Sequence, residues 1–186
     1  MLNISNAVFQ LLVIPILIHY ATPVKLGVYF IALSFGVLAS ILVNFGSSQT
    51  AVVEIRRATN ENEKAVISAE TLAIRFYPLC IAVLVTVVVS AASDKGVYYL
   101  AILPMLFAEF INPQFYLTAE YKINKYSILN IVIRTLVLGV IYFFRNNDQL
   151  IFIALLSSGL GMFLLNALFF KQTFFATQLN VLWPTF

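Results

Sequence analysis

Charge is scarce in this chain, and several kinds of site are missing with it. Only 10% of its 186 residues are Asp, Glu, Lys or Arg, whereas soluble domains carry roughly a quarter. The single Cys80 excludes an internal disulfide framework, and the single His19 excludes a histidine-rich metal site. There is no glycine-rich phosphate loop, zinc-binding histidine pair or nucleophile elbow. We therefore expect neither an enzyme nor a cofactor, and a net charge of +3 gives no indication of nucleic acid.

Long apolar blocks make up most of the chain. The sequence is 61% hydrophobic, with a mean hydropathy of +0.94. Six blocks come near the roughly 20 residues that a helix needs to cross the hydrocarbon core. They are Asn3–Tyr20, Leu26–Asn44, Thr71–Ala92, Val97–Thr118, Tyr126–Phe144 and Leu150–Phe170. The blocks are continuously apolar and do not alternate as barrel strands would. The sequence thus predicts an all-α integral membrane protein with six transmembrane helices.

The basic residues predict the orientation of these helices. With the N-terminus in the cytoplasm, the inner connections hold Arg56, Arg57, Lys64, Lys122, Lys125 and Lys171. The outer connections then hold Lys25, Lys95 and Arg145. This excess favours a cytoplasmic N-terminus by the positive-inside rule. We expect the connector Glu54–Glu70 to be helical, either at the interface or as an inward extension of the second helix, since it lacks glycine and proline.

Two charged residues lie inside the predicted membrane helices, where they are costly and usually face the protein interior. At 1.5 Å per residue, Glu109 is about 18 Å and Arg134 about 15 Å below the same surface. Each shares a helix face with polar neighbours, and the first helix has a third polar edge. The candidate substrate-binding residues are Arg134, Asn130, Glu109, Asn112, Asn6 and Gln10. An ion pair, a shared polar cavity and a purely structural role all remain open for the two charges.

Other residues support more ordinary interpretations. Arg75 lies about four residues inside its predicted helix, so we expect it to reach the cytoplasmic interface as an anchor. Four prolines in or near helix interiors can bend or break them: Pro15, Pro78, Pro104 and Pro113. Small residues at Ala154, Ser157, Ser158 and Gly161 predict close helix contact. Five tyrosines fit an interfacial aromatic belt: Tyr98, Tyr99, Tyr116, Tyr121 and Tyr126.

A series of short motifs is spread over nearly the whole chain. They are Pro15, Thr22–Tyr29, Asn44–Gln49, Glu54–Arg57, Asn112–Tyr116, Glu120–Lys122, Tyr126–Asn130 and Arg134. In order, spacing and helix placement, the chain resembles the N-terminal half of polysaccharide flippases. These exporters of O-antigen and lipid-linked oligosaccharides belong to the multidrug/oligosaccharidyl-lipid/polysaccharide flippase superfamily.

The resemblance implies one six-helix lobe, residues 1–170, of a two-lobed transporter in the bacterial inner membrane. Residues 171–186 would then be a cytoplasmic tail or a truncation remnant, and the chain a truncated half. The implied function is alternating-access translocation of undecaprenyl-diphosphate-linked oligosaccharide, such as an O-antigen or capsule repeat unit. Arg134 would bind the diphosphate, and Glu109 would orient Arg134 or couple a proton or cation. The implied partners are membrane lipids and the polymerase and glycosyltransferases of the same pathway. A multidrug antiporter lobe and a non-transporting membrane subunit or scaffold are the alternatives.

Overall fold

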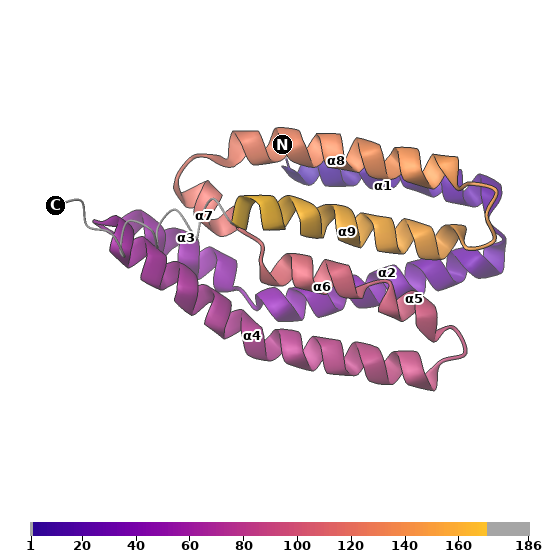
Figure 1. The fold of residues 1–186 in the computed structure, drawn as a ribbon, viewed down its shortest axis with the longest axis horizontal. Coiled ribbons are helices and arrows are strands. Elements are labelled where there is room, and N and C mark those ends of the chain that lie inside the picture. Colours follow the sequence, from indigo (N-terminus) through magenta and orange to yellow (C-terminus); the bar gives the residue numbers. More distant parts are fainter. Residues whose placement is uncertain (1, 171–186) are drawn as a thin grey trace.

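The structure is a computed structural model that describes the backbone of residues 2–170 and the side chains of residues 8–170 (Figure 1). Within this range the secondary structure is entirely helical. The helices are α1 (Leu2–Tyr20), α2 (Pro23–Asn44), α3 (Ser47–Arg57), α4 (Glu61–Ala92), α5 (Gly96–Leu100), α6 (Leu103–Phe110), α7 (Gln114–Ala119), α8 (Ile123–Phe143) and α9 (Leu150–Phe170). The all-α prediction is therefore confirmed for the described part of the chain.

Five helical stretches in the described range are long and apolar enough to cross a membrane. They are Pro23–Arg57, Glu61–Ala92, Gly96–Ala119, Ile123–Phe143 and Leu150–Phe170. The described apolar part of α1, Val8–Tyr20, is shorter than such a span. Large apolar side chains cover the outside of the bundle, as a lipid-facing surface requires. These features are those of a multi-pass membrane protein.

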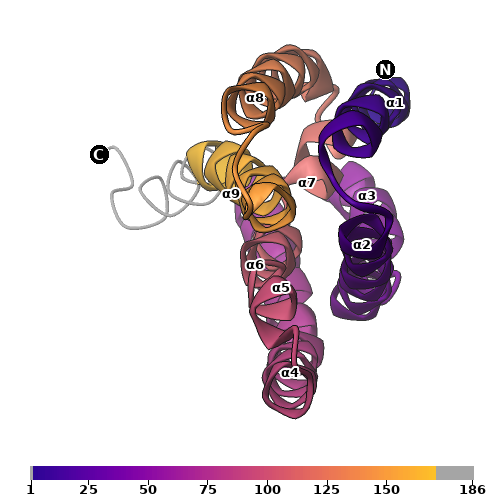
Figure 2. The same ribbon diagram turned by 90° about the vertical axis from the view of Figure 1, so that its right-hand side faces the viewer.

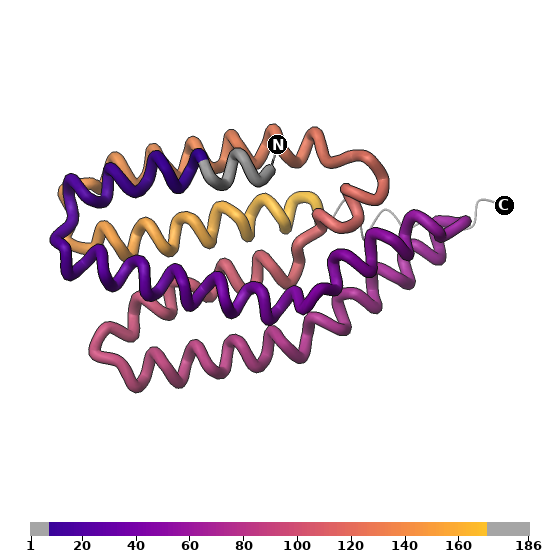
Figure 3. The backbone as a smooth tube through the Cα atoms, turned by 180° about the vertical axis from the view of Figure 1, so that it is seen from behind, coloured from indigo at the N-terminus to yellow at the C-terminus, as the bar shows by residue number. Residues whose placement is uncertain are grey.

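The helices form a bundle in which α9 occupies the middle. It packs against α6 on one side and α8 on the other, and α1 runs along α8 (Figures 1 and 2). Helix α4 lies on the far side of the bundle from α1 and α8 (Figure 2). The tube in Figure 3 shows the connected path of α2 and α3 beside the long α4. Several helices can therefore contribute side chains to one interior space.

Two of the membrane-crossing stretches are broken. Between α2 and α3 the backbone of Phe45 and Gly46 turns to positive φ, at 41° and 74°. The predicted block Val97–Thr118 falls within a stretch that is long and apolar enough to cross a membrane, but this stretch divides into α5, α6 and α7. Pro104 lies in the first turn of α6, and Pro113 immediately precedes α7. Proline lacks an amide donor and clashes with the preceding turn, which explains its position at these boundaries.

The connector predicted to be helical does extend the bundle. Helix α3 continues α2 beyond the break, and α4 begins at Glu61, so Ser47–Glu70 forms an α3–α4 hairpin (Figure 1). Asn60 caps α4 by accepting a hydrogen bond from the Glu63 amide at 2.8 Å. The Glu63 carboxylate in turn accepts from the Thr59 amide at 2.8 Å. This reciprocal capping sets the turn between the two helices.

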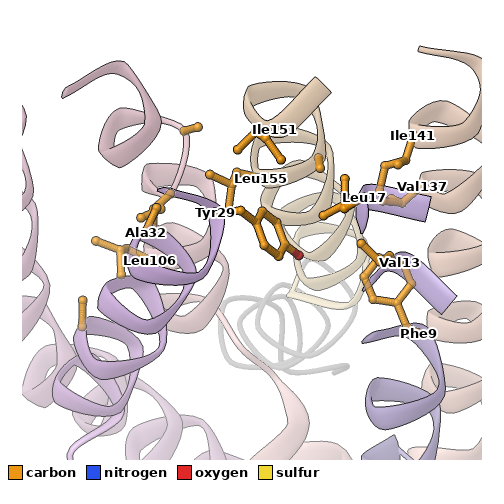
Figure 4. Packing of buried hydrophobic residues seen from close by; sticks show 14 of the residues in the cluster. Phe9, Val13, Leu17, Tyr29, Ala32, Leu106, Val137, Ile141, Ile151 and Leu155 are labelled. Atoms are coloured by element: carbon orange, nitrogen blue, oxygen red, sulfur yellow. The ribbon is translucent and has the colours of Figure 1, made fainter. Parts of the chain in front are cut away.

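The apolar core joins the membrane helices at several levels. Leu17 of α1, Ala32 of α2, Leu106 of α6, Ile141 of α8 and Ile151 of α9 are all buried (Figure 4). The predicted small-residue contact of the last helix is confirmed, since Ala154 and Gly161 are buried. A Cβ atom at Gly161 would lie only 2.9 Å from a Val137 methyl group of α8. In lipid, close packing of this kind is a main source of helix association.

Candidate functional site

A cavity of about 790 Å³ opens inside the bundle. Its walls come from α1, α2, α3, α6, α7, α8 and α9. The apolar lining includes Phe9, Tyr29, Leu33, Ile102 and Leu155. The polar lining comprises Gln10, Ser40, Asn44, Ser48, Gln49, Asn112, Gln114, Thr118, Ser158 and Asn166. Among the described residues, the charged side chains that line the cavity are Glu109 and Arg134. The two residues singled out from the sequence thus share one cavity.

Arg134 lies near the middle of α8 with much of its hydrogen-bonding capacity unused. Its Nε donates to Asn130 Oδ1 at 3.2 Å, and one Nη approaches Met162 Sδ at 3.6 Å. A face of the guanidinium covers the Phe9 ring, 4.8 Å from its centroid. A guanidinium has five N–H donors, so most of them have no partner among the described residues. A group in this state is suited to bind an anion that enters the cavity.

Asn130 supports Arg134 and is absent from the cavity lining. It is 1% exposed and lies one turn before Arg134 on α8. Its Oδ1 fixes the Arg134 guanidinium, whereas its Nδ2 has no hydrogen-bond partner in the described part of the structure. The sequence placed Asn130 with the substrate-binding residues. In this structure its side chain contacts Arg134, which lines the cavity.

Glu109 lines the cavity near the end of α6, beside the break that Pro113 marks. Its Oε2 accepts a hydrogen bond from Asn112 Nδ2 at 3.2 Å. No ion pair of the described residues joins Glu109 to Arg134. Asn112, another candidate from the sequence, lines the cavity, and its Oδ1 accepts a hydrogen bond from the Gln114 amide at 3.1 Å in the turn before α7. Of the alternatives left open by the sequence, the structure shows the shared cavity.

Arg75 is the main correction to the sequence interpretation. It is fully buried and does not reach the interface. Its Nε and Nη2 donate to the hydroxyls of Ser47 and Ser48, at 2.9 and 2.6 Å. Its Nη1 lies 3.2–3.3 Å from three backbone oxygens, those of Glu109, Phe110 and Asn112. Arg75 therefore ties the α2–α3 break to the α6–α7 break.

The reason for this error is the position of the helix start. Helix α4 begins at Glu61, ten residues before the predicted Thr71, so Arg75 lies well inside it. A usable signal was present in the spacing of Ser68, Thr71 and Arg75, which share one helix face and are all buried. The same criterion had marked the polar edges of the other helices.

A chain of polar contacts forms one end of the site. Gln114 Nε2 donates to the Tyr126 hydroxyl at 3.0 Å, and that hydroxyl donates to Asn166 Oδ1 at 2.7 Å. Asn166 Nδ2 donates to the backbone oxygen of Ala108 at 2.7 Å. Tyr126 is fully buried, so its assignment to an interfacial belt was wrong. These contacts link α6, α7, α8 and α9 at one level.

The remaining candidates come from α1. Gln10 lines the cavity and is exposed. The side chain of Asn6 lies outside the described residues, as does the tail at 171–186. In the part of the chain that the structure describes, no group of three or more His, Cys, Asp or Glu side chains could hold a metal ion.

Comparisons of the chain with models of protein families, with curated proteins and with solved structures gave no match. Its class therefore follows from the molecule alone: an all-α, multi-pass membrane protein with a charged interior cavity.

Proposed function

We propose that this chain is one lobe of a transporter that moves a diphosphate-linked oligosaccharide on an undecaprenyl carrier across the bacterial inner membrane. The observation that carries the proposal is Arg134, whose guanidinium lines a cavity within the membrane-spanning bundle and has unused donors. Intramembrane charges of this kind mark substrate pathways by default.

The chemistry of the cavity is that of an anionic, sugar-bearing head group. The planar guanidinium matches phosphate oxygens and can donate two parallel hydrogen bonds to them. Amide and hydroxyl groups such as Asn112, Gln49 and Thr118 supply partners for sugar hydroxyls. The lipid tail would stay in the bilayer while alternating access carries the head group between leaflets.

The finer topology belongs to the same proposal. Helix α1 would be a sixth span, with a cytoplasmic N-terminus, so that the α3–α4 hairpin and the α7–α8 turn face the cytoplasm. Arg56, Arg57, Lys64 and Lys122 lie on these segments, in keeping with the positive-inside rule. The cavity would face a second lobe, and the partners would be the polymerase and glycosyltransferases of the pathway.

The test is binding and flipping of an undecaprenyl-diphosphate sugar by the purified chain. Binding is measured in lipid nanodiscs, and flipping in proteoliposomes with a fluorescent head group. Arg134→Ala should weaken binding at least about tenfold, because a charge-assisted hydrogen bond contributes about 1.5–3 kcal/mol. Arg134→Lys should be intermediate, since lysine cannot donate in the same fork.

Arg57→Gln is the matched control, because it removes a basic charge that is exposed on the α3–α4 hairpin. It should bind like the unaltered chain. Unchanged binding and flipping in both Arg134 variants would contradict the proposal.

A further inference from the structure

Glu109 places a carboxylate on the cavity wall, and none of the ion pairs among the described residues includes it. The charge of the buried Arg75 acts on this carboxyl from within the bundle. However, Arg75 donates to the backbone oxygen of Glu109 and not to its carboxylate. The carboxyl interacts instead with two amide side chains, Asn112 of the α6–α7 break and Asn44 of α2. One carboxylate thus faces the cavity without a cation in contact.

The positions of Glu109 and Arg134 can be compared through α9. Arg134 contacts Met162, and the residue before Glu109, Ala108, contacts Asn166. Met162 and Asn166 are one helical turn apart, which is about 6 Å along the axis. The cavity therefore presents a positive and a negative group at neighbouring levels, which do not neutralise each other.

This separation fits an occupant that carries both charges. A carboxylate held away from bulk water is costly unless a cation or donor compensates it. A phosphate at Arg134 leaves Glu109 with the charge of Arg75, which does not contact its carboxylate, whereas an ammonium group has three donors for the carboxylate and the neighbouring amide oxygens. A sugar attached directly to the phosphate can carry its amino group to another part of the same cavity wall.

We propose that Glu109 forms a subsite for a protonated amino group on the sugar next to the diphosphate. The preferred head group is then zwitterionic, with its phosphate at Arg134 and its ammonium at Glu109. This inference rests on the proposed function for its anionic half, and it adds the substrate class.

The experiment compares two lipid diphosphates that differ in one group. One carries glucosamine with a free amine, and the other carries N-acetylglucosamine, which has no charge at that position. Binding to the full chain in nanodiscs is measured at fixed pH and potassium concentration. We expect at least about tenfold tighter binding of the free amine, as for a close charge pair away from bulk water. Glu109→Gln keeps the side-chain shape and should abolish this preference, so that the two lipids bind this variant equally.

Two variants separate the roles of the charges. Arg134→Gln should weaken the binding of both lipids by the same factor. Glu70→Gln removes an exposed carboxylate of α4 that is absent from the cavity lining, and it should keep the preference.

The outcomes are distinct. Equal binding of the two lipids, or a preference that survives in Glu109→Gln, overturns the amine subsite but leaves the proposed function intact. Failure of the chain to bind either lipid overturns both. A sodium titration that changes binding of both lipids in the unaltered chain, but not in Glu109→Gln, would assign the carboxylate to an inorganic cation and also overturn the amine subsite.

Discussion

Two arginines lie in the membrane-spanning bundle, and their surroundings differ in one decisive respect. The guanidinium of Arg75 is fully buried and donates to five acceptors on two broken helices. The guanidinium of Arg134 is only half-buried and contacts one amide oxygen, one sulfur and one aromatic ring. The N–H donors of Arg75 are used by the protein, whereas Arg134 keeps N–H donors that a ligand could use.

The comparison shows that the presence of a charge at membrane depth does not by itself identify a binding residue. Both arginines satisfy the rule that intramembrane charges face the interior. The number of protein acceptors around each guanidinium separates a structural role from a ligand-binding role. The difference should appear in two different measurements, stability for Arg75 and ligand affinity for Arg134.

The largest effect is expected from Arg75→Gln. Five acceptors would lose their charged donor in a buried site, so the free energy of unfolding should fall by about 3 kcal/mol or more. Denaturant titration in detergent micelles measures this change. Arg134→Gln is the matched comparison and should remain within about 1 kcal/mol of the unaltered chain, because few protein contacts are lost. Equal destabilisation by the two changes would contradict the assignment of a structural role to Arg75 alone.

Gly46→Ala tests the backbone turn between α2 and α3, which places Ser47 and Ser48 next to Arg75. Gly46 has a φ of 74° and no heavy atom within 4 Å of an added Cβ. The change therefore introduces backbone strain without a clash, and we expect a loss of about 1 kcal/mol. The same titration measures it, and lipid binding at Arg134 should not change.

Gly139→Ala is the control for this experiment. Gly139 lies inside α8, the helix of Arg134, and an added Cβ there also meets nothing within 4 Å. Because its backbone is helical, alanine should be neutral or stabilise the protein by up to about 1 kcal/mol. A stability loss at Gly139 equal to that at Gly46 would show that positive φ is not the cause.

The sequence was sufficient to predict the helices but not their breaks. The block Leu150–Phe170 was predicted at the bounds that the structure has, because continuous apolarity and polar ends define it. Val97–Thr118 is also a long apolar block, yet it is divided, whereas Pro15 and Pro78 remain inside α1 and α4. A proline pattern alone does not distinguish these cases, since neighbouring helices decide whether freed backbone groups find partners.

The candidate site could also be predicted only in part, because some of its features are local to the chain and others depend on contacts between helices. Glu109 and Arg134 could be found from charge and helical spacing, which are local properties of the chain. The burial of Arg75 and Tyr126 depends on acceptors supplied by other helices, 27 to 40 residues away. Such contacts exist only after the helices have packed, so local spacing cannot specify them.

The smallest expected effect concerns the contact between the α7–α8 turn and the first turn of α4. There the α7–α8 turn is held to α4 by Lys64, whose Nζ lies 2.7 Å from Glu120 Oε1. This hydrogen bond from Lys64, followed by one from Lys122, lowers the pKa of Glu120 below its ordinary value. A carboxylate with a lowered folded-state pKa stabilises the protein above its unfolded pKa and loses that contribution as the pH falls through the folded value.

Glu120→Gln should therefore reduce stability at neutral pH by less than about 1 kcal/mol, as is usual for partly exposed pairs. The difference in stability between Glu120→Gln and the unaltered chain should narrow as the pH falls below the ordinary glutamate pKa of about 4.3. Thermal unfolding in detergent across this range measures it, with the exposed Glu70→Gln as control. If this stability difference stays the same at acid pH, the Lys64 contact does not hold the turn. Because Glu120 is absent from the cavity lining, lipid binding at Arg134 should be the same in both variants at neutral pH.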